Sequence, residues 1–324
     1  MPNIPPISRK QFLKVAGLSF LSAASACTVS QSPSTAPPTG KPKKRALRIA
    51  HLTDFHVMPM GDAPNGMRNA IRHAQAQADP PDIFLNTGDC IMDSLETTKE
   101  ITEKQWETFN KIIKEECELP IVHCIGNHDV WGWGAPTPDK QSDPLYGKGM
   151  ALKQLDLPER YYSFDRAGWH FIVLDSNFQA EAGSQYPYIG KLDDAQFAWL
   201  EKDIQAVDTE MPICIASHIP ILCACEFFDG DNEASGDWVV PAAWMHIDAR
   251  RFRQLFLQHP NIRLCLSGHS HQHETLQYCG VWYFTNGAVC GNWWRGEYLD
   301  FPPAYVLVDL YEDGSADSTF IPYG

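Results

Sequence analysis

Short apolar runs alternate along the chain with segments whose apolar residues recur at helical spacing. Runs of this length, mostly apolar and bounded by polar residues, are typical of buried strands. Six such runs predict strands: Leu47–Leu52, Asp82–Thr87, Ile121–Ile125, His170–Asp175, Ile213–Ser217 and Ile262–Ser267.

Between these runs, apolar residues recur every three or four positions, which places them on one face of a helix. The residues with this spacing are Ile101, Gln105, Phe109, Ile112 and Ile113, then Phe197, Leu200, Ile204 and Val207, then Phe252, Leu255 and Phe256. Asp193, Asp194 and Asp248 precede the last two sets as capping candidates. Strand–helix alternation predicts an α/β architecture with largely buried strands.

The C-terminal part has a different pattern. Thr275–Thr285, Ala304–Tyr311 and Ser318–Tyr323 are strand-like, with few helical segments between them. Two packed sheets flanked by helices would accommodate both parts. Trp131–Gly149 and Ile221–Trp244 follow neither pattern, and are loops long enough to carry function.

Charge is distributed unevenly along this chain of 324 residues. Residues 1–46 contain seven Lys or Arg and no acid, so residues 47–324 carry a net charge of −21 against −14 for the whole chain. A domain this acidic repels phosphate backbones at long range, so we expect no nucleic-acid partner.

Residues 1–26 are predicted to be a signal peptide. A polar, basic start leads into the apolar run Val15–Ala26, which is too short to span a bilayer and ends in small residues. The start resembles a twin-arginine signal, with Lys10 where the second arginine is expected. We therefore expect an exported protein, either periplasmic or anchored to the outer side of the inner membrane.

Cys27 follows this segment at a position that resembles a bacterial lipoprotein junction, although Ala24 stands where leucine is usual. Lipid anchoring therefore stays open. Residues 27–46 are rich in Ser, Thr and Pro and predict a flexible linker. Residues 47–324 form the predicted catalytic domain.

Ten cysteines raise the question of disulfides in an exported protein. Most lie in or beside strand-like runs, where a free cysteine behaves as a small buried apolar residue. A bridge among four of them is left open: Cys223, Cys225, Cys279 and Cys290.

Polar residues with metal-binding or catalytic side chains follow five of the predicted strands. The sequences at these strand ends are Asp54-Phe55-His56, Gly88-Asp89, Gly126-Asn127-His128-Asp129, Ser217-His218 and Gly268-His269-Ser270-His271. The carboxyl ends of strands in an α/β sheet meet at one edge, where ligands bind. Each motif alone is weak, but together they predict a metal site.

Mixed carboxylate and imidazole ligands suit zinc, iron or manganese. A bridging carboxylate can hold two such ions ~3.5–4 Å apart, and a water between them loses its proton near neutral pH and becomes a nucleophile.

Together these motifs resemble the signature of the calcineurin-like metallophosphoesterase superfamily, with every element present from Asp54 to His271. The resemblance implies a two-sheet β-sandwich flanked by helices, in four αββα layers. It also implies metal-dependent hydrolysis of a small phosphomonoester or phosphodiester by a metal-bridging hydroxide. The implied ligands are Asp54, His56, Asp89 and His271 for one metal, and Asp89, Asn127, His218 and His269 for the other.

His128 is predicted to donate a proton to the leaving alkoxide or to stabilise charge on the phosphoryl oxygens. The alternative is a structural histidine beside the site. Its carboxylate partner stays open between Asp93 and Asp129. Trp131 and Trp133 either form an aromatic wall over the leaving group, with Arg295 pairing to phosphate, or pack elsewhere.

Two departures from related signatures narrow the function. Met92 occupies the position of the metal-bound tyrosine of purple acid phosphatases, so we expect no tyrosinate–iron site. Asp93 lies one residue later than the corresponding aspartate of calcineurin-type protein phosphatases, and no Arg-Gly follows it. A phosphoprotein phosphatase is therefore the alternative, and a non-catalytic binding protein is the less favoured one.

Overall fold

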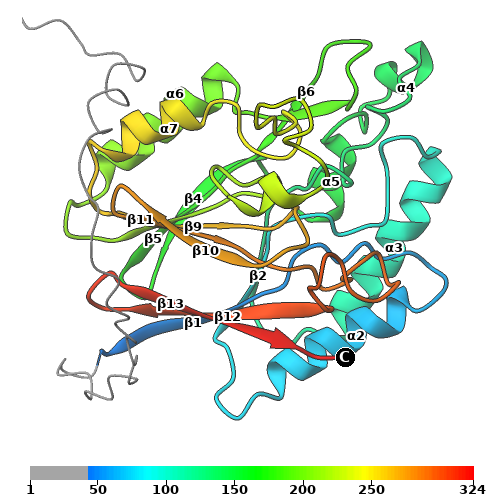
Figure 1. The fold of residues 1–324 in the computed structure, drawn as a ribbon. Helices are drawn as coiled ribbons and strands as arrows, with labels where there is room; N and C mark the ends of the chain where they lie inside the picture. The colour runs from blue at the N-terminus through cyan, green and yellow to red at the C-terminus, as the bar shows by residue number, and fades with distance from the viewer. Residues whose placement is uncertain (1–42) are drawn as a thin grey trace, which may run out of the picture. The chain divides into compact units, whose positions relative to one another are not determined.

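The first predicted strand lies at the centre of a five-stranded mixed sheet (Figure 1). β1 (Arg45–His51) pairs in parallel with β2 (Ile83–Asn86), and β2 in parallel with β3 (Ile121–His123). On its other side β1 pairs antiparallel with β12 (Ala304–Tyr311), which pairs antiparallel with β13 (Ala316–Pro322).

A six-stranded sheet contains the other long strands in the order β10-β11-β9-β8-β5-β4. Their bounds are Glu274–Tyr278, Val281–Thr285, Ile262–Ser267, Ile213–Ala216, Trp169–Val173 and Tyr162–Arg166. The four middle strands are parallel, while β10 and β4 pair antiparallel at the two edges. A separate short hairpin joins β6 (Asn177–Gln179) to β7 (Tyr188–Gly190).

The two sheets pack face to face, because alternate residues of their strands point to opposite sides. In β1, Ile49 belongs to the apolar core between the sheets, and Ala50 to the core on the outer face. In β8, Cys214 faces the other sheet while Ile215 faces outward.

Helices cover both outer faces. α2 (Ala63–Gln75) and α3 (Lys99–Glu116) pack on the five-stranded sheet, and α6 (Asp194–Ala206) and α7 (Ala249–Phe256) on the six-stranded sheet. As predicted, Asp193 caps α6, because its side chain accepts the N–H of Gln196. The two-sheet, helix-flanked fold expected from the sequence is thereby confirmed (Figure 1).

The two long loops contain only short helices. These are α4 (Pro138–Ser142) in the first loop, α5 (Gly149–Gln154) at its end, and the 3₁₀ helix η1 (Cys225–Phe228) in the second. Every cysteine in the described part of the chain has a free thiol. Within the same part, no helix is both long enough and apolar enough to cross a membrane.

This computed structural model describes residues 43–324. The predicted signal peptide, Cys27 and the linker up to residue 42 lie outside the described residues. Export and lipid anchoring therefore stay predictions.

Candidate metal centre and active site

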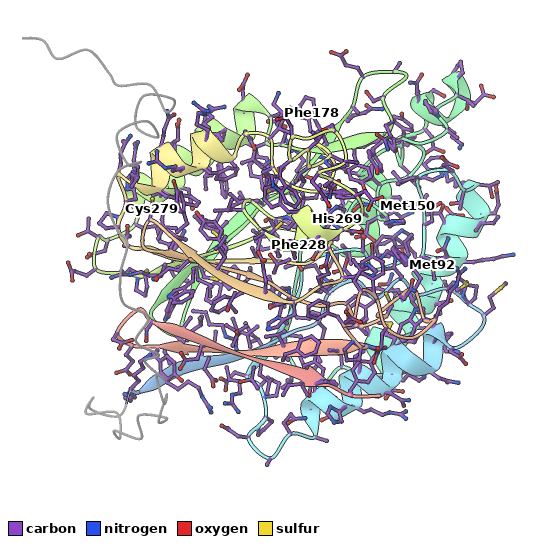
Figure 2. All side chains as sticks on the ribbon, viewed as in Figure 1. Met92, Met150, Phe178, Phe228, His269 and Cys279 are labelled. Carbon is purple, nitrogen blue, oxygen red and sulfur yellow. The ribbon has the colours of Figure 1, made fainter. Side chains whose placement is uncertain are left out.

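The eight residues predicted from strand-end motifs come together at one edge of the two sheets. Figure 2 places His269 among the side chains at this edge. They follow five strands: Asp54 and His56 after β1, Asp89 after β2, Asn127 and His128 after β3, His218 after β8, and His269 and His271 after β9. Six of them, all except His128 and His269, are at most 2 % exposed. The fold therefore removes a group of polar side chains from water and points them at one another.

Backbone strain accompanies this convergence. Five of these residues have a positive φ: Asp54 at 55°, His56 at 41°, Asp89 at 52°, His269 at 73° and His271 at 57°. Residues other than glycine rarely adopt this conformation, which costs of order 1–3 kcal/mol and occurs mainly at functional sites. The strain indicates that side-chain direction at this edge matters more than local stability.

Two motif glycines allow the carboxylates to approach the neighbouring backbone. A Cβ on Gly126 would lie 2.2 Å from Asp89 Oδ1, and a Cβ on Gly268 would lie 2.3 Å from Asp54 Oδ2. No side chain fits at these separations. The glycines of the Gly-Asn-His and Gly-His motifs are therefore required by close packing against the two aspartates.

Backbone carbonyls fix the orientation of the imidazoles. His218 Nδ1 lies 3.0 Å from the carbonyl oxygen of Thr87, and His271 Nδ1 lies 2.6 Å from that of Gly291. His269 uses its other nitrogen, with Nε2 3.0 Å from the carbonyl oxygen of Ala243. Because a carbonyl only accepts, each of these nitrogens carries the proton, and the opposite nitrogen presents a lone pair.

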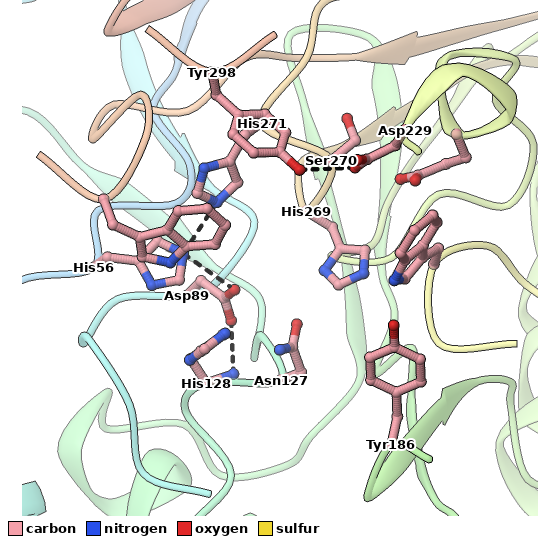
Figure 3. A pocket seen from close by; sticks show the side chains of 13 residues that line it. His56, Asp89, Asn127, His128, Tyr186, Asp229, His269, Ser270, His271 and Tyr298 are labelled. Carbon is pink, nitrogen blue, oxygen red and sulfur yellow. Dashed lines mark hydrogen bonds and ion pairs between the residues drawn. The ribbon is translucent and has the colours of Figure 1, made fainter. Parts of the chain in front are cut away.

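Those lone-pair nitrogens point inward and crowd together. His56 Nε2 lies 3.1 Å from His271 Nε2, and His269 Nδ1 lies 3.1 Å from His218 Nε2. Asp89 lies between the two pairs, with Oδ2 3.2 Å from His218 Nε2 and 3.4 Å from His56 Nε2, and Figure 3 draws the second of these contacts. Acceptors this close repel one another unless a cation lies between them, so the donor set fits two metal ions that share Asp89.

Burial keeps His56, His269 and His271 neutral, as metal ligation requires. It lowers the pKa of His269 to about 3, and lowers the pKa of His56 and His271 below the usual value. His218 is the exception, because although burial opposes it, Asp89 raises its pKa to about 9, so a metal ion would have to displace the proton on its Nε2.

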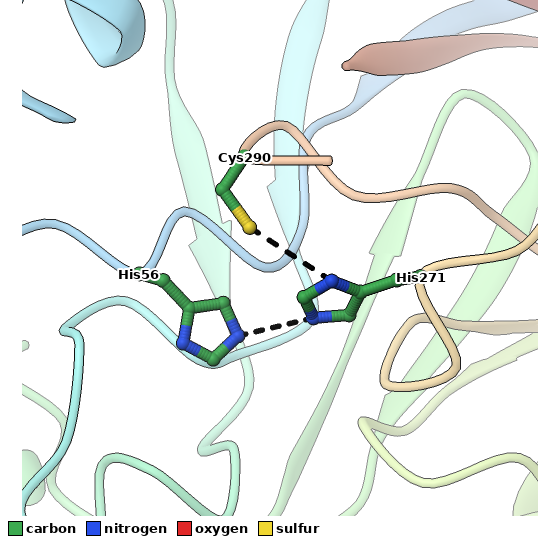
Figure 4. A group of neighbouring side chains, drawn as sticks. All are labelled: His56, His271 and Cys290. Carbon is green, nitrogen blue, oxygen red and sulfur yellow. Dashed lines mark hydrogen bonds between the residues drawn. The ribbon is translucent and has the colours of Figure 1, made fainter. Parts of the chain in front are cut away.

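Cys290, which is also buried, places its Sγ 3.9 Å from His271 Nδ1 (Figure 4). The thiol lies on the carbonyl-bound side of that ring, away from the nitrogen that faces His56.

His128 lies at the edge of this cluster, and its side chain is 25 % exposed. Its Nδ1 lies 3.4 Å from Asp93 Oδ1. The other candidate partner, Asp129, instead accepts the backbone N–H groups of Cys90 and Gly126 at 2.9 Å each. Asp93 is therefore the carboxylate that faces His128. Burial lowers the pKa of His128, but the negative charges of Asp89 and Asp93 outweigh it and the pKa is raised.

A cavity of about 250 Å³ opens over the cluster (Figure 3). Six of its lining residues belong to neither the predicted ligands nor the motifs: Tyr186, Glu226, Asp229, Trp244, Trp293 and Tyr298. The lining does not include Trp131 or Trp133, which join the core near α3, nor Arg295, which is exposed. The packing alternative is thus correct for the two tryptophans. Apart from the length of their loop, no sequence pattern points to Glu226 and Asp229.

Residues 47–273 match the calcineurin-like phosphoesterase family. The chain belongs to this family. A phosphoesterase family agrees with the donor set described above.

Two curated relatives match most of the chain. A probable cyclic nucleotide phosphodiesterase of Synechococcus sp. is 25 % identical, covering 83 % of this chain and 89 % of its own. A 3′,5′-cyclic-nucleotide phosphodiesterase of Nostoc sp. is also 25 % identical, covering 84 % and 91 %. Among solved structures, a dimetal phosphatase of Danio rerio superposes with a TM-score of 0.57 at 14 % identity, covering 87 % of this chain and all of that one. This last likeness shows a shared fold.

Proposed function

We propose that this member of the calcineurin-like phosphoesterase family hydrolyses phosphate esters with two metal ions. Asp54, His56, Asp89 and His271 would hold one ion, and Asp89, Asn127, His218 and His269 the other. The observation that carries the proposal is the pairing of inward lone-pair nitrogens on either side of Asp89. Manganese, iron or zinc suits this mixture of oxygen and imidazole ligands.

When bound, the two ions supply positive charge to the phosphoryl oxygens and lower the pKa of water to the neutral range. The chain contributes a proton donor. His128 lies beside the cluster, and its backbone N–H donates to Asp89 Oδ1 at 2.8 Å, which fixes its place relative to the shared ligand. Against the effect of burial, Asp89 and Asp93 raise the pKa of His128, which favours the protonated imidazole that a general acid for the leaving oxygen requires.

Two alternatives carry less support. A non-catalytic protein on this fold has no need of a protonated histidine with its own carboxylate at the edge of the site. A phosphoprotein phosphatase uses the same chemistry, and differs only in what enters the cavity. Substrate tests separate these three functions.

The test is hydrolysis by the purified full chain supplied with manganese, zinc or iron. Substrates are a nitrophenyl phosphate monoester, its diester, a phosphoserine peptide and 3′,5′-cyclic AMP, the last because of the name of the Nostoc relative. His128→Ala should lower kcat for the preferred ester by about 10²–10⁴-fold while both metals stay bound. His259→Ala is the matched control, because this histidine lies in the turn between α7 and β9, at the opposite end of β9 from His269. Failure to bind metal would contradict the proposal.

A further inference from the structure

One wall of the cavity contains two acids that the proposed chemistry does not use. Glu226 is only 2 % exposed, lines the cavity, and its Oε1 has no hydrogen-bond partner among residues 43–324. Asp229 lines the cavity beside it and accepts the hydroxyl of Tyr298 at 2.9 Å. A buried carboxyl with an unpartnered oxygen is costly, and its place in a cavity wall points to a ligand that supplies the partner.

A positively charged group would suit this wall as the missing partner. Among the described residues that line the cavity there is no lysine and no arginine. Burial raises the pKa of Glu226 to about 9, with Cys225, Asp229 and Glu274 acting in the same direction. The carboxyl therefore keeps its proton while no cation is near. A bound ammonium group would lower this pKa and pair with the ionised carboxylate, whereas a second phosphate would oppose that ionisation.

The aromatic residues of the same cavity suit an ammonium group as well. Tyr298 reaches the acidic wall through its hydrogen bond to Asp229, and Tyr186 and Trp244 also line the space. Trp293 lines the metal side of the cavity, with its ring centroid 4.5 Å from that of His271. The faces of such rings attract cations, and aromatic cages are the usual recognition site for quaternary ammonium groups. A volume of about 250 Å³ leaves room for a small headgroup.

The acidic wall and His128 lie on opposite sides of the metal cluster. Figure 3 shows Asp229 across the cavity from His128, with Asn127 and His269 between them. If His128 protonates the leaving oxygen, the ammonium group belongs to the part of the substrate that stays on phosphorus. Such a substrate has two organic arms, and is therefore a phosphodiester.

We propose that the cavity selects phosphodiesters in which one arm is a small ammonium-bearing alcohol of the choline or ethanolamine kind, held by Glu226, Asp229 and the aromatic walls. This rests on the proposed function. Water adds to phosphorus, the P–O bond to the other arm breaks, and the departing oxygen takes the proton of His128. The products are a neutral alcohol and the phosphomonoester of the amino alcohol, and a proton of the water restores His128.

The test compares nitrophenyl phosphorylcholine with nitrophenyl 3,3-dimethylbutyl phosphate, using the metal-loaded full chain. The two esters have the same shape and leaving group, and differ only in that a carbon replaces the charged nitrogen. We expect kcat/KM to favour the choline ester at least tenfold, and nitrophenyl phosphorylethanolamine to be favoured as well. Glu226→Gln and Asp229→Asn should each reduce this preference severalfold. Glu233→Gln, an exposed acid on the same loop, should leave it unchanged.

Equal or faster hydrolysis of the dimethylbutyl ester would overturn the proposal, and so would a preference that survives in both acid variants. If both esters are hydrolysed in a metal-dependent way at equal rates, only the subsite is wrong and the proposed function stands. If no ester is hydrolysed by a protein that binds two metals, the proposed function itself fails. A second test needs no variant. Free choline should inhibit hydrolysis of the choline ester more strongly than free 3,3-dimethylbutanol does, and equal inhibition would count against the subsite.

Discussion

The pairing of His128 with Asp93 makes protonation of the leaving group depend on one carboxylate. Asp93→Asn retains the shape of this side chain and removes its charge. At 3.4 Å the attraction between unit charges is about 1.2 kcal/mol in water and about 5 kcal/mol at an effective dielectric constant of 20. The two side chains are 25 % and 29 % exposed, so solvent screens the pair and the lower part of this range applies. We expect a loss of ~1.4 kcal/mol, which lowers the pKa of His128 by about one unit.

The assay is the pH profile of kcat for two phosphate esters with different leaving groups. An alkoxide leaves poorly without a proton, whereas nitrophenolate leaves readily. In the variant, the loss of activity at alkaline pH should begin about one pH unit lower for the alkyl ester, because His128 loses its proton at a lower pH. At a pH above both pKa values, the alkyl rate should fall about tenfold, and the nitrophenyl rate should change little.

Glu96→Gln is the matched control, because it removes one negative charge from an exposed residue of the same loop. It should leave both profiles unchanged. The reasoning is refuted if Asp93→Asn slows the two esters equally, or if the alkaline limb does not move. Either outcome would mean that Asp93 affects folding or metal binding, and that it does not raise the pKa of His128.

The remaining predictions concern stability and metal. Asp129→Asn should cost about 1–3 kcal/mol in urea unfolding, since one of the two N–H groups at 2.9 Å then faces an amide donor. Phe109→Ala, a 1 % exposed ring of α3, should cost about 3–5 kcal/mol while metal content stays at two ions per chain. His170 lies 2.6 Å from Asp165 and 2.9 Å from Asp203, and although burial opposes it, these partners raise the pKa of His170. Wild type should therefore exceed His170→Gln in stability, by up to about 1 kcal/mol after solvent screening, below about pH 6.5, and lose this advantage as pH rises through the raised pKa. Removing metal with a chelator should lower the melting temperature, because each site contributes about 2.7 kcal/mol when free metal is 100-fold above its Kd.

The metal cluster could be predicted because its ligands are tied to strand ends. A buried strand such as β1 or β9 is recognisable from a few apolar residues, and the residue that follows it has little freedom of position. Where the apolar pattern is less regular, the sequence predicts the bounds of strands and helices less well. The run Thr275–Thr285 is in fact a hairpin, with β10 and β11 joined at Cys279-Gly280. The helix α2 buries mainly alanines and has a proline in its first turn, so its apolar spacing carries little signal.

The acidic wall has no such local determinant, and this explains why the chemistry of the site is easier to read from sequence than its specificity. Trp131 lies three residues from His128, yet its backbone pairs with Gly147 and its ring joins the core near α3. Asp229 and Tyr298 are far apart in sequence and meet through one hydrogen bond between two loops. Proximity along the chain was misleading in the first case, and only the tertiary fold creates contact in the second.

The two loops around the cavity support two of the metal ligands through backbone carbonyls, those of Ala243 and Gly291, which accept from His269 and His271. Because these contacts involve no loop side chain, the side chains of the acidic wall can change while the metal cluster stays intact. The determinants of substrate choice are therefore to be sought in Ile221–Trp244 and in the segment after β11.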